Sequence, residues 1–131
     1  MNKNKGFTII ELIVVIAIIA VLAAIVLVNV TQYIAKSRDA AIKGNLATIA
    51  TNAAVWFDAN TTYVGFAASS TYTNPAVAIT SAGGGSIVTA ETISAFCVEA
   101  VLNDDTTWCV DSTGYKGATA DCDATADCAA D

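Results

Sequence analysis

The feature that most constrains this chain is an uninterrupted apolar run over residues 7–28, which reads FTIIELIVVIAIIAVLAAIVLV. Thr8 and Glu11 are the only polar side chains within it. As a helix that rises about 1.5 Å per residue, the run would be roughly 33 Å long, and the hydrocarbon core of a bilayer is about 30 Å thick. A single small domain of a 131-residue chain could hardly bury such a segment. The run therefore predicts a helix that lies in a membrane or between subunits.

Helical periodicity continues beyond the apolar run. Five apolar residues follow at spacings of 4, 3, 4 and 3, which places them on one stripe of a helix: Ile42, Leu46, Ile49, Ala53 and Trp56. No Gly or Pro occurs between Phe7 and Lys43. A removable signal peptide has a shorter apolar core of about 7–15 residues. We therefore predict one helix over about residues 7–58, apolar all round in its first half (7–28) and amphipathic in its second half (29–58).

The remaining residues, 59–131, predict a small β-sheet head. Segments 92–102 and 106–112 flank Asn103, Asp104 and Asp105, a pattern typical of a β-hairpin. Apolar residues alternate along one face of this hairpin: Phe96, Val98, Ala100, Leu102, Trp108 and Val110. We expect that face to pack on the helix stripe, and two shorter strands near residues 76–80 and 86–89. The predicted fold class is α+β, a long N-terminal helix packed against a small antiparallel sheet.

Four cysteines lie in the last third of the chain: Cys97, Cys109, Cys122 and Cys128. An even number in a small head indicates disulfides formed outside the cytosol, and their spacing, without histidine, disfavours zinc. If Val98 lies opposite Trp108 in the hairpin, then Cys97 lies opposite Cys109. This register favours a Cys97–Cys109 bridge and leaves the other two cysteines to pair, although four cysteines permit three connectivities.

The charge balance narrows the function further. The chain has 12 acidic and 6 basic residues, and from Asp58 onward Lys116 is the only base against ten acids. Such an anionic head repels phosphate, so we expect no direct binding of nucleic acid. The chain contains no histidine, the commonest general base and the usual partner of a Ser or Cys nucleophile. We therefore expect a protein that is not an enzyme.

One acidic pattern near the C-terminus has two interpretations. Asp121, Asp123 and Asp127 supply carboxylates at a spacing similar to that of calcium loops, but Ala126 stands where such loops have a glycine. We prefer a solvated acidic tail, with calcium as the alternative. No other cofactor is expected.

Residues 5–25, KGFTIIELIVVIAIIAVLAAI, resemble the N-terminus shared by type IV pilins and type II secretion pseudopilins. The resemblance combines a short cationic leader that ends in Gly6, the following Phe7, Glu11 four residues later, and the apolar run. It covers roughly the first 40 residues, and the head is similar to the family only in layout. The resemblance implies that a prepilin peptidase removes leader residues 1–6 by cutting between Gly6 and Phe7, and methylates the new amine of Phe7.

The resemblance also implies a location and partners. The subunit would span the inner membrane once with its head outside, contact lipid and the pilus assembly machinery there, and then polymerise with copies of itself into an extracellular filament. Glu11 would pair with the Phe7 ammonium of a neighbouring subunit. The expected function is a major pilin-like subunit; the alternatives are a minor pilin, a pseudopilin, or a membrane-anchored module whose head binds calcium or another ligand.

Many members of that family carry a Pro in the later part of the apolar segment, and this chain has none there. Any local loosening of the helix would therefore depend on the β-branched residues within 25–31.

Overall fold

A computed structural model describes residues 6–118 and 120–130 of the chain. The chain divides into two compact units, one up to Ile34 and one from Ala35 onward. Helix α1 (Ile9–Asn60) contributes to both units. It includes the β-branched stretch 25–31, where the Thr31 hydroxyl donates to the Val28 carbonyl oxygen at 2.9 Å. The predicted long helix is confirmed, and it is helical throughout that stretch.

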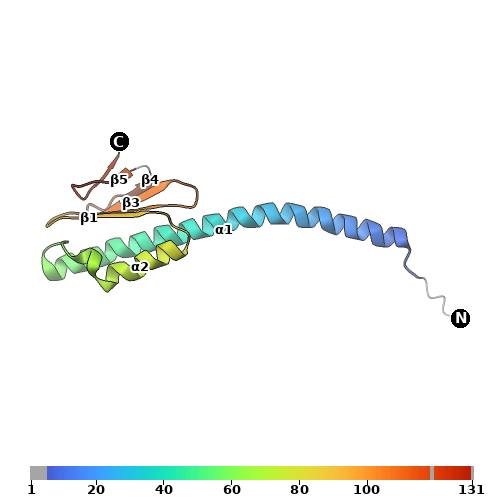
Figure 1. Ribbon diagram of the computed structural model, residues 1–131, viewed down its shortest axis with the longest axis horizontal. Helices are drawn as coiled ribbons and strands as arrows, with labels where there is room; N and C mark the ends of the chain where they lie inside the picture. Colours follow the sequence, from blue (N-terminus) through green and yellow to red (C-terminus); the bar gives the residue numbers. More distant parts are fainter. Residues whose placement is uncertain (1–5, 119, 131) are drawn as a thin grey trace. The chain divides into compact units, whose positions relative to one another are not determined.

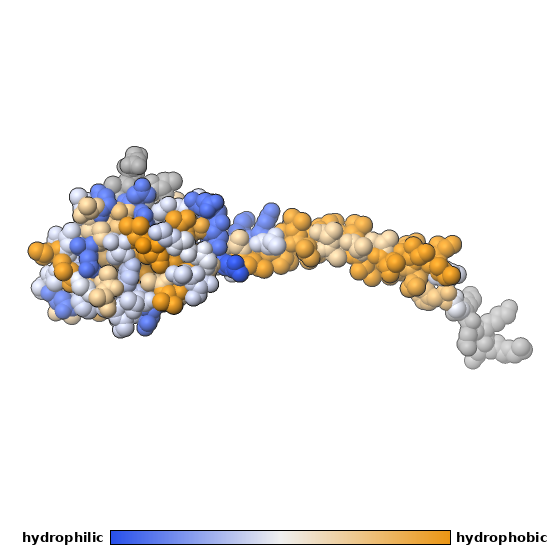
Figure 2. All heavy atoms as spheres, viewed as in Figure 1, coloured by the Kyte–Doolittle hydropathy of each residue, from blue (hydrophilic) through white to orange (hydrophobic). Residues whose placement is uncertain are grey.

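The N-terminal unit is a helix whose large apolar side chains are exposed among the residues that the structure describes. From Ile9 to Ile34 the large apolar side chains are 47–77% exposed. The most apolar 18-residue window of α1 has a mean hydropathy of 3.3, and none of it is buried. Figure 2 shows apolar side chains along this segment. By length and composition the helix can cross a membrane.

The second unit is a head built in layers around a four-stranded antiparallel sheet. After α1 come a 3-10 turn η1 (Phe66–Ala68), helix α2 (Ser70–Ser81) and strands β1 (Ile87–Glu91), β2 (Phe96–Val101), β3 (Thr107–Asp111) and β4 (Lys116–Ala118). The strands pair in the order β1-β2-β3-β4. Strands β5 (Ala120–Cys122) and β6 (Cys128–Ala130) form a separate two-stranded ribbon. In Figure 1, α1 and α2 lie on one side of the sheet and β5 on the other.

The core lies between α1 and the sheet, as the two hydrophobic patterns predict. Ile42, Leu46, Ile49 and Ala53 are at most 1% exposed. They belong to one cluster with the predicted inner face of the hairpin, of which these residues are buried: Phe96, Val98, Ala100, Leu102 and Val110. Trp56 of the helix stripe and Trp108 of the hairpin face pack against this cluster while half-buried, and Phe57 does the same.

The predicted strand near residues 76–80 is wrong, because this segment belongs to helix α2. Pro75 lies inside the helix and has no N–H to donate to the Thr71 carbonyl oxygen. The Asn52 side chain of α1 donates to that oxygen instead, at 2.7 Å. Ile79 of α2 is fully buried in the head core. Packing on α1 thus stabilises α2. The composition of residues 76–80 alone had indicated a strand. The strand predicted near residues 86–89 is confirmed as β1.

The predicted β2–β3 hairpin is confirmed, but its predicted register is wrong by two residues. Val98 lies opposite Val110, and Trp108 lies opposite Ala100. The reason is the three-residue turn, in which the Leu102 N–H donates to the Thr106 carbonyl oxygen at 2.8 Å. Asp105 ends the turn in the left-handed conformation, with φ 62°, as is common in three-residue hairpin loops.

A buried carboxylate that the sequence patterns did not single out joins α1 to this turn. Asp39 is 9% exposed and accepts hydrogen bonds from both the backbone N–H and the side-chain amide of Asn103, each at 2.8 Å. The same amide lies 3.4 Å from the Ala82 carbonyl oxygen, just after α2. Asp39 therefore ties α1 to the β2–β3 turn, and Asn103 extends this contact to the end of α2.

We expect Asp39→Ala to lower the free energy of unfolding by about 1–3 kcal/mol, because it strands the Asn103 donors. Denaturant unfolding of the full chain in detergent, followed by tryptophan fluorescence, measures this difference. Asp58→Ala removes an exposed acid from the same helix and should change stability by less than about 0.5 kcal/mol. Equal effects of the two substitutions would contradict the role of Asp39.

Candidate functional site

The predicted processing site lies just before helix α1. Leader residues 1–5 lie outside the described residues, whereas Gly6 and Phe7 are described and precede the helix. Phe7 is 83% exposed. A Cβ added to Gly6 would meet nothing within 4 Å. The packing of the described residues therefore does not require a glycine at position 6.

Thr8 and Glu11 cap the start of α1 reciprocally. The Glu11 carboxylate accepts hydrogen bonds from the Thr8 backbone N–H at 2.9 Å and from the Thr8 hydroxyl at 2.8 Å. In return, the Glu11 backbone N–H donates to the Thr8 hydroxyl oxygen at 3.2 Å. This is a capping box, which satisfies backbone donors at a helix start. The role of Thr8 was not among the sequence-based predictions, although Thr-x-x-Glu before an apolar run is the signature of a capping box.

The four cysteines form two disulfides that differ from the predicted pairs. Cys97 bonds to Cys122 and Cys109 bonds to Cys128, with Cα separations of 5.6 and 5.9 Å. The predicted Cys97–Cys109 and Cys122–Cys128 bridges are therefore wrong. In the observed register Cys97 lies opposite Asp111 and Cys109 opposite Glu99, so the two cysteines are diagonal neighbours. Diagonal residues lie about 7–8 Å apart, beyond the usual Cα separation of about 4.4–6.8 Å for a disulfide.

The disulfides fix the β5–β6 ribbon to the outer face of the sheet. Cys122 and Cys128 lie opposite each other in the ribbon, yet each bonds to a cysteine of the sheet. Two acids on the outer face of the sheet, Glu99 and Asp111, each accept a hydrogen bond from one of these ribbon cysteines. Glu99 accepts the Cys122 N–H at 2.7 Å, and Asp111 accepts the Cys128 N–H at 3.2 Å. Each cysteine of the ribbon is thus held by a covalent bond and a charge-assisted hydrogen bond.

Asp111 is the most heavily hydrogen-bonded acid of this face. Burial alone would raise its pKa, but hydrogen bonds from the Thr113 hydroxyl, the Asp127 side chain and the Tyr115 and Cys128 N–H groups hold the pKa below its ordinary value. The pKa of Asp127 is raised, mainly because its carboxyl hydrogen-bonds to Asp111, with burial and repulsion from that carboxylate adding to the shift. When the pair holds one proton, that proton therefore favours Asp127 over Asp111.

This pair predicts a pH dependence of the stability of the head. Because the folded pKa of Asp127 is raised, its proton stabilises the fold fully below the unfolded pKa of about 3.9, and this contribution is lost as the pH rises through the folded pKa. In Asp127→Asn the amide donates to Asp111 at every pH. The free energy of unfolding of the variant, relative to the unaltered chain, should therefore increase as the pH rises through that pKa. Denaturant unfolding between about pH 3 and pH 7 measures it, and a constant difference would contradict the pairing.

The calcium candidates do not converge in the structure. Among residues 6–118 and 120–130, no group of three or more Asp, Glu, Cys or His side chains could hold a metal ion. The Asp123 carboxylate accepts the Thr125 N–H and hydroxyl at 2.8 and 2.5 Å. These bonds hold the pKa of Asp123 below its ordinary value. Asp127 faces Asp111, whereas Asp121 is exposed on β5. The Asp123 carboxylate also lies 3.5 Å from the Asp127 backbone N–H, but the Asp127 carboxyl is bonded to Asp111.

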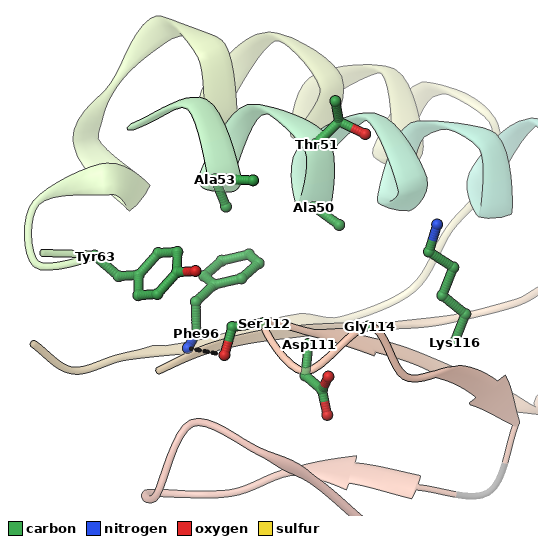
Figure 3. Close-up of a pocket in the computed structure, with 10 residues that line it drawn as sticks. Ala50, Thr51, Ala53, Tyr63, Phe96, Asp111, Ser112, Gly114 and Lys116 are labelled. Carbon is green, nitrogen blue, oxygen red and sulfur yellow. Dashed lines mark hydrogen bonds between the residues drawn. The ribbon is translucent and has the colours of Figure 1, made fainter. Parts of the chain in front are cut away.

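A cavity of about 200 Å³ lies in the head between α1 and the end of β3 (Figure 3). Tyr63 and Phe96 line one side, and the Phe96 N–H donates a hydrogen bond to the Ser112 hydroxyl oxygen at 3.2 Å. Lys116 extends toward α1 at the other side, whereas the Asp111 carboxylate points away from the helix (Figure 3). The cavity therefore does not bring this acid and this base together.

Comparisons with known proteins agree with the N-terminal motif. The sequence profile of the prokaryotic N-terminal methylation motif matches residues 1–27. The chain is 44% identical over 86 residues to fimbrial protein Q of Moraxella bovis, a match that covers 64% of this chain and 53% of the relative. The chain thus spans about half the length of this curated relative. No solved structure matches it significantly. The methylation motif over residues 1–27 and the similarity to a fimbrial protein both support the resemblance to type IV pilins, and the long helix packed on a small antiparallel sheet is consistent with it.

Proposed function

We propose that the chain is a major subunit of a type IV pilus, which is stored in the inner membrane and polymerised through its N-terminal helix. The observation that supports this proposal is the apolar helix of the first unit. In its most apolar 18-residue window, no residue is buried. Exposed apolar surface of this extent needs lipid before assembly and neighbouring subunits afterwards. The fimbrial protein among the relatives supports the same function.

Processing precedes assembly in this proposal. A prepilin peptidase removes residues 1–6 and methylates the new amine of Phe7, which the methylation motif over residues 1–27 supports. In the filament the Glu11 carboxylate leaves Thr8 and pairs with the Phe7 ammonium of a neighbouring subunit. Because a buried charge without a partner is strongly unfavourable, this pair sets the axial register of packed helices. The apolar side chains around it supply the attraction.

The test is the composition of filaments sheared from cells. We expect them to consist mainly of this polypeptide, with Phe7 as the N-terminal residue and its amine methylated. A trace amount in the filaments would indicate a minor pilin or a pseudopilin instead. Retention of the whole polypeptide in the membrane fraction, with no filaments that contain it, would indicate a membrane-anchored module. Either result would overturn the role of major subunit.

A further inference from the structure

The capping box fixes where helix α1 begins relative to the proposed cleavage site. A backbone hydrogen bond runs from the Leu12 N–H to the Thr8 carbonyl oxygen at 3.2 Å. One residue earlier, the Glu11 N–H meets the Thr8 hydroxyl rather than a backbone carbonyl. The Thr8 side chain thereby takes the place that the preceding turn of a longer helix would occupy. Gly6 and Phe7 remain outside the helix, with Phe7 83% exposed.

A helix that began one turn earlier would include the Gly6–Phe7 peptide bond and engage the Gly6 carbonyl oxygen in a helical hydrogen bond. In an α-helix the N–H of Ile10 would donate to the Gly6 carbonyl oxygen, the atom that a protease has to polarise. Hydrolysis of this bond adds water, with the hydroxyl going to the Gly6 carbonyl carbon and the hydrogen to the Phe7 nitrogen. The attack requires a carbonyl that is free of helical hydrogen bonds. Gly6 disfavours a longer helix by its low propensity, and the capping box adds a specific stop signal.

We propose that Thr8 is a positioning residue for removal of the leader: by capping α1 with Glu11, it keeps the Gly6–Phe7 bond in non-helical chain for the peptidase. This inference rests on the proposed function, in which that bond is cleaved. It assigns Glu11 two successive partners, Thr8 before processing and the neighbouring Phe7 ammonium in the filament. The two roles make different demands on the side chain, since capping needs an acceptor oxygen, which Gln also supplies, whereas pairing needs a negative charge.

The experiment compares cleavage of four full-length chains by purified prepilin peptidase in detergent: the unaltered chain, Thr8→Val, Thr8→Ser and Glu11→Gln. Thr8→Val keeps the shape of the side chain but removes the hydroxyl. We expect kcat for removal of residues 1–6 to fall about fivefold, the size of a lost N-cap, with KM changed less than twofold. Thr8→Ser and Glu11→Gln keep both halves of the box and should stay within about twofold of the unaltered chain.

The outcomes separate this inference from the proposed function. Cleavage of Thr8→Val at the unaltered rate, or of Thr8→Ser as slowly as Thr8→Val, would overturn the positioning role of Thr8 and leave the proposed function standing. Failure of the peptidase to cut the unaltered chain between Gly6 and Phe7 would instead overturn the proposed function. Mapping of the two disulfides in each variant confirms that the head has folded, so that a slow rate reports on the cleavage site.

Discussion

Cells that carry Glu11→Gln are expected to accumulate processed subunits in the membrane while the yield of surface filaments falls at least tenfold. The substitution keeps the length of the side chain and its ability to cap α1, so cleavage after Gly6 should continue. It removes the negative charge, and the Phe7 ammonium would enter the filament core without a carboxylate. Stranding one partner of a buried ion pair costs about 3–5 kcal/mol, and this penalty recurs with every added subunit.

The measurement takes both quantities from the same cells: processed protein by its N-terminal residue, and filaments by shearing. Asp58→Asn is the matched control, since it removes one negative charge from an exposed position of the same helix and should leave the filament yield unchanged. A normal yield from Glu11→Gln would contradict the charge pair, although the similarity to type IV pilins would remain. Loss of processing as well would show that the carboxylate itself, and not an acceptor oxygen, is needed for cleavage.

Removal of either observed disulfide should lower the free energy of unfolding by about 3 kcal/mol. The bridges close loops with sequence separations of 25 and 19 residues, and the chain-entropy estimate for loops of this length is about 3 kcal/mol each. The variants Cys97→Ala/Cys122→Ala and Cys109→Ala/Cys128→Ala each remove one bridge and keep the other. Denaturant unfolding of the oxidised chains measures the loss. Such a loss is a large fraction of the stability of a small head.

A third double variant distinguishes the observed pairs from those that the hairpin pattern favoured. Cys97→Ala/Cys109→Ala breaks both observed bridges and should cost about 6 kcal/mol, twice the loss of the other two variants. With the pairs favoured by the sequence it would break only one bridge and cost about 3 kcal/mol, whereas each of the other two variants would break both bridges. Peptide mapping without reduction gives the connectivity of the unaltered chain directly. A Cys97–Cys109 peptide there would contradict the observed register of β2 and β3.

The sequence by itself determined the features that depend on which side chains can meet water. The apolar run of residues 7–28 has no polar face, so it predicts a helix covered by lipid or by other subunits. The stripe of Ile42, Leu46 and Ile49 and the alternation along β2 each follow one period, and the two apolar faces had to meet in the core. The spacing of apolar residues, and the face that they bury, can be recognised from neighbouring positions in the sequence. No information on which distant residues meet in the fold is needed.

Contacts between residues far apart in the chain depend on how the elements of the head pack, so the sequence patterns did not predict them. The three-residue turn at 103–105 pairs Leu102 with Thr106, and in this register Cys97 lies opposite Asp111 and out of reach of Cys109. The cysteine pairs then followed from the β5–β6 ribbon lying on the outer face of the sheet.

Helix α2 and the buried Asp39 were decided in the same way. The Asn52 donor that completes α2 lies 19 residues from its acceptor, and Asp39 lies 64 residues from Asn103. The capping box of Thr8 and Glu11 is the opposite case, because both residues lie within one helical turn. Pairings across such long separations leave no periodic pattern in the sequence, since their geometry exists only once the layers of the head have packed together.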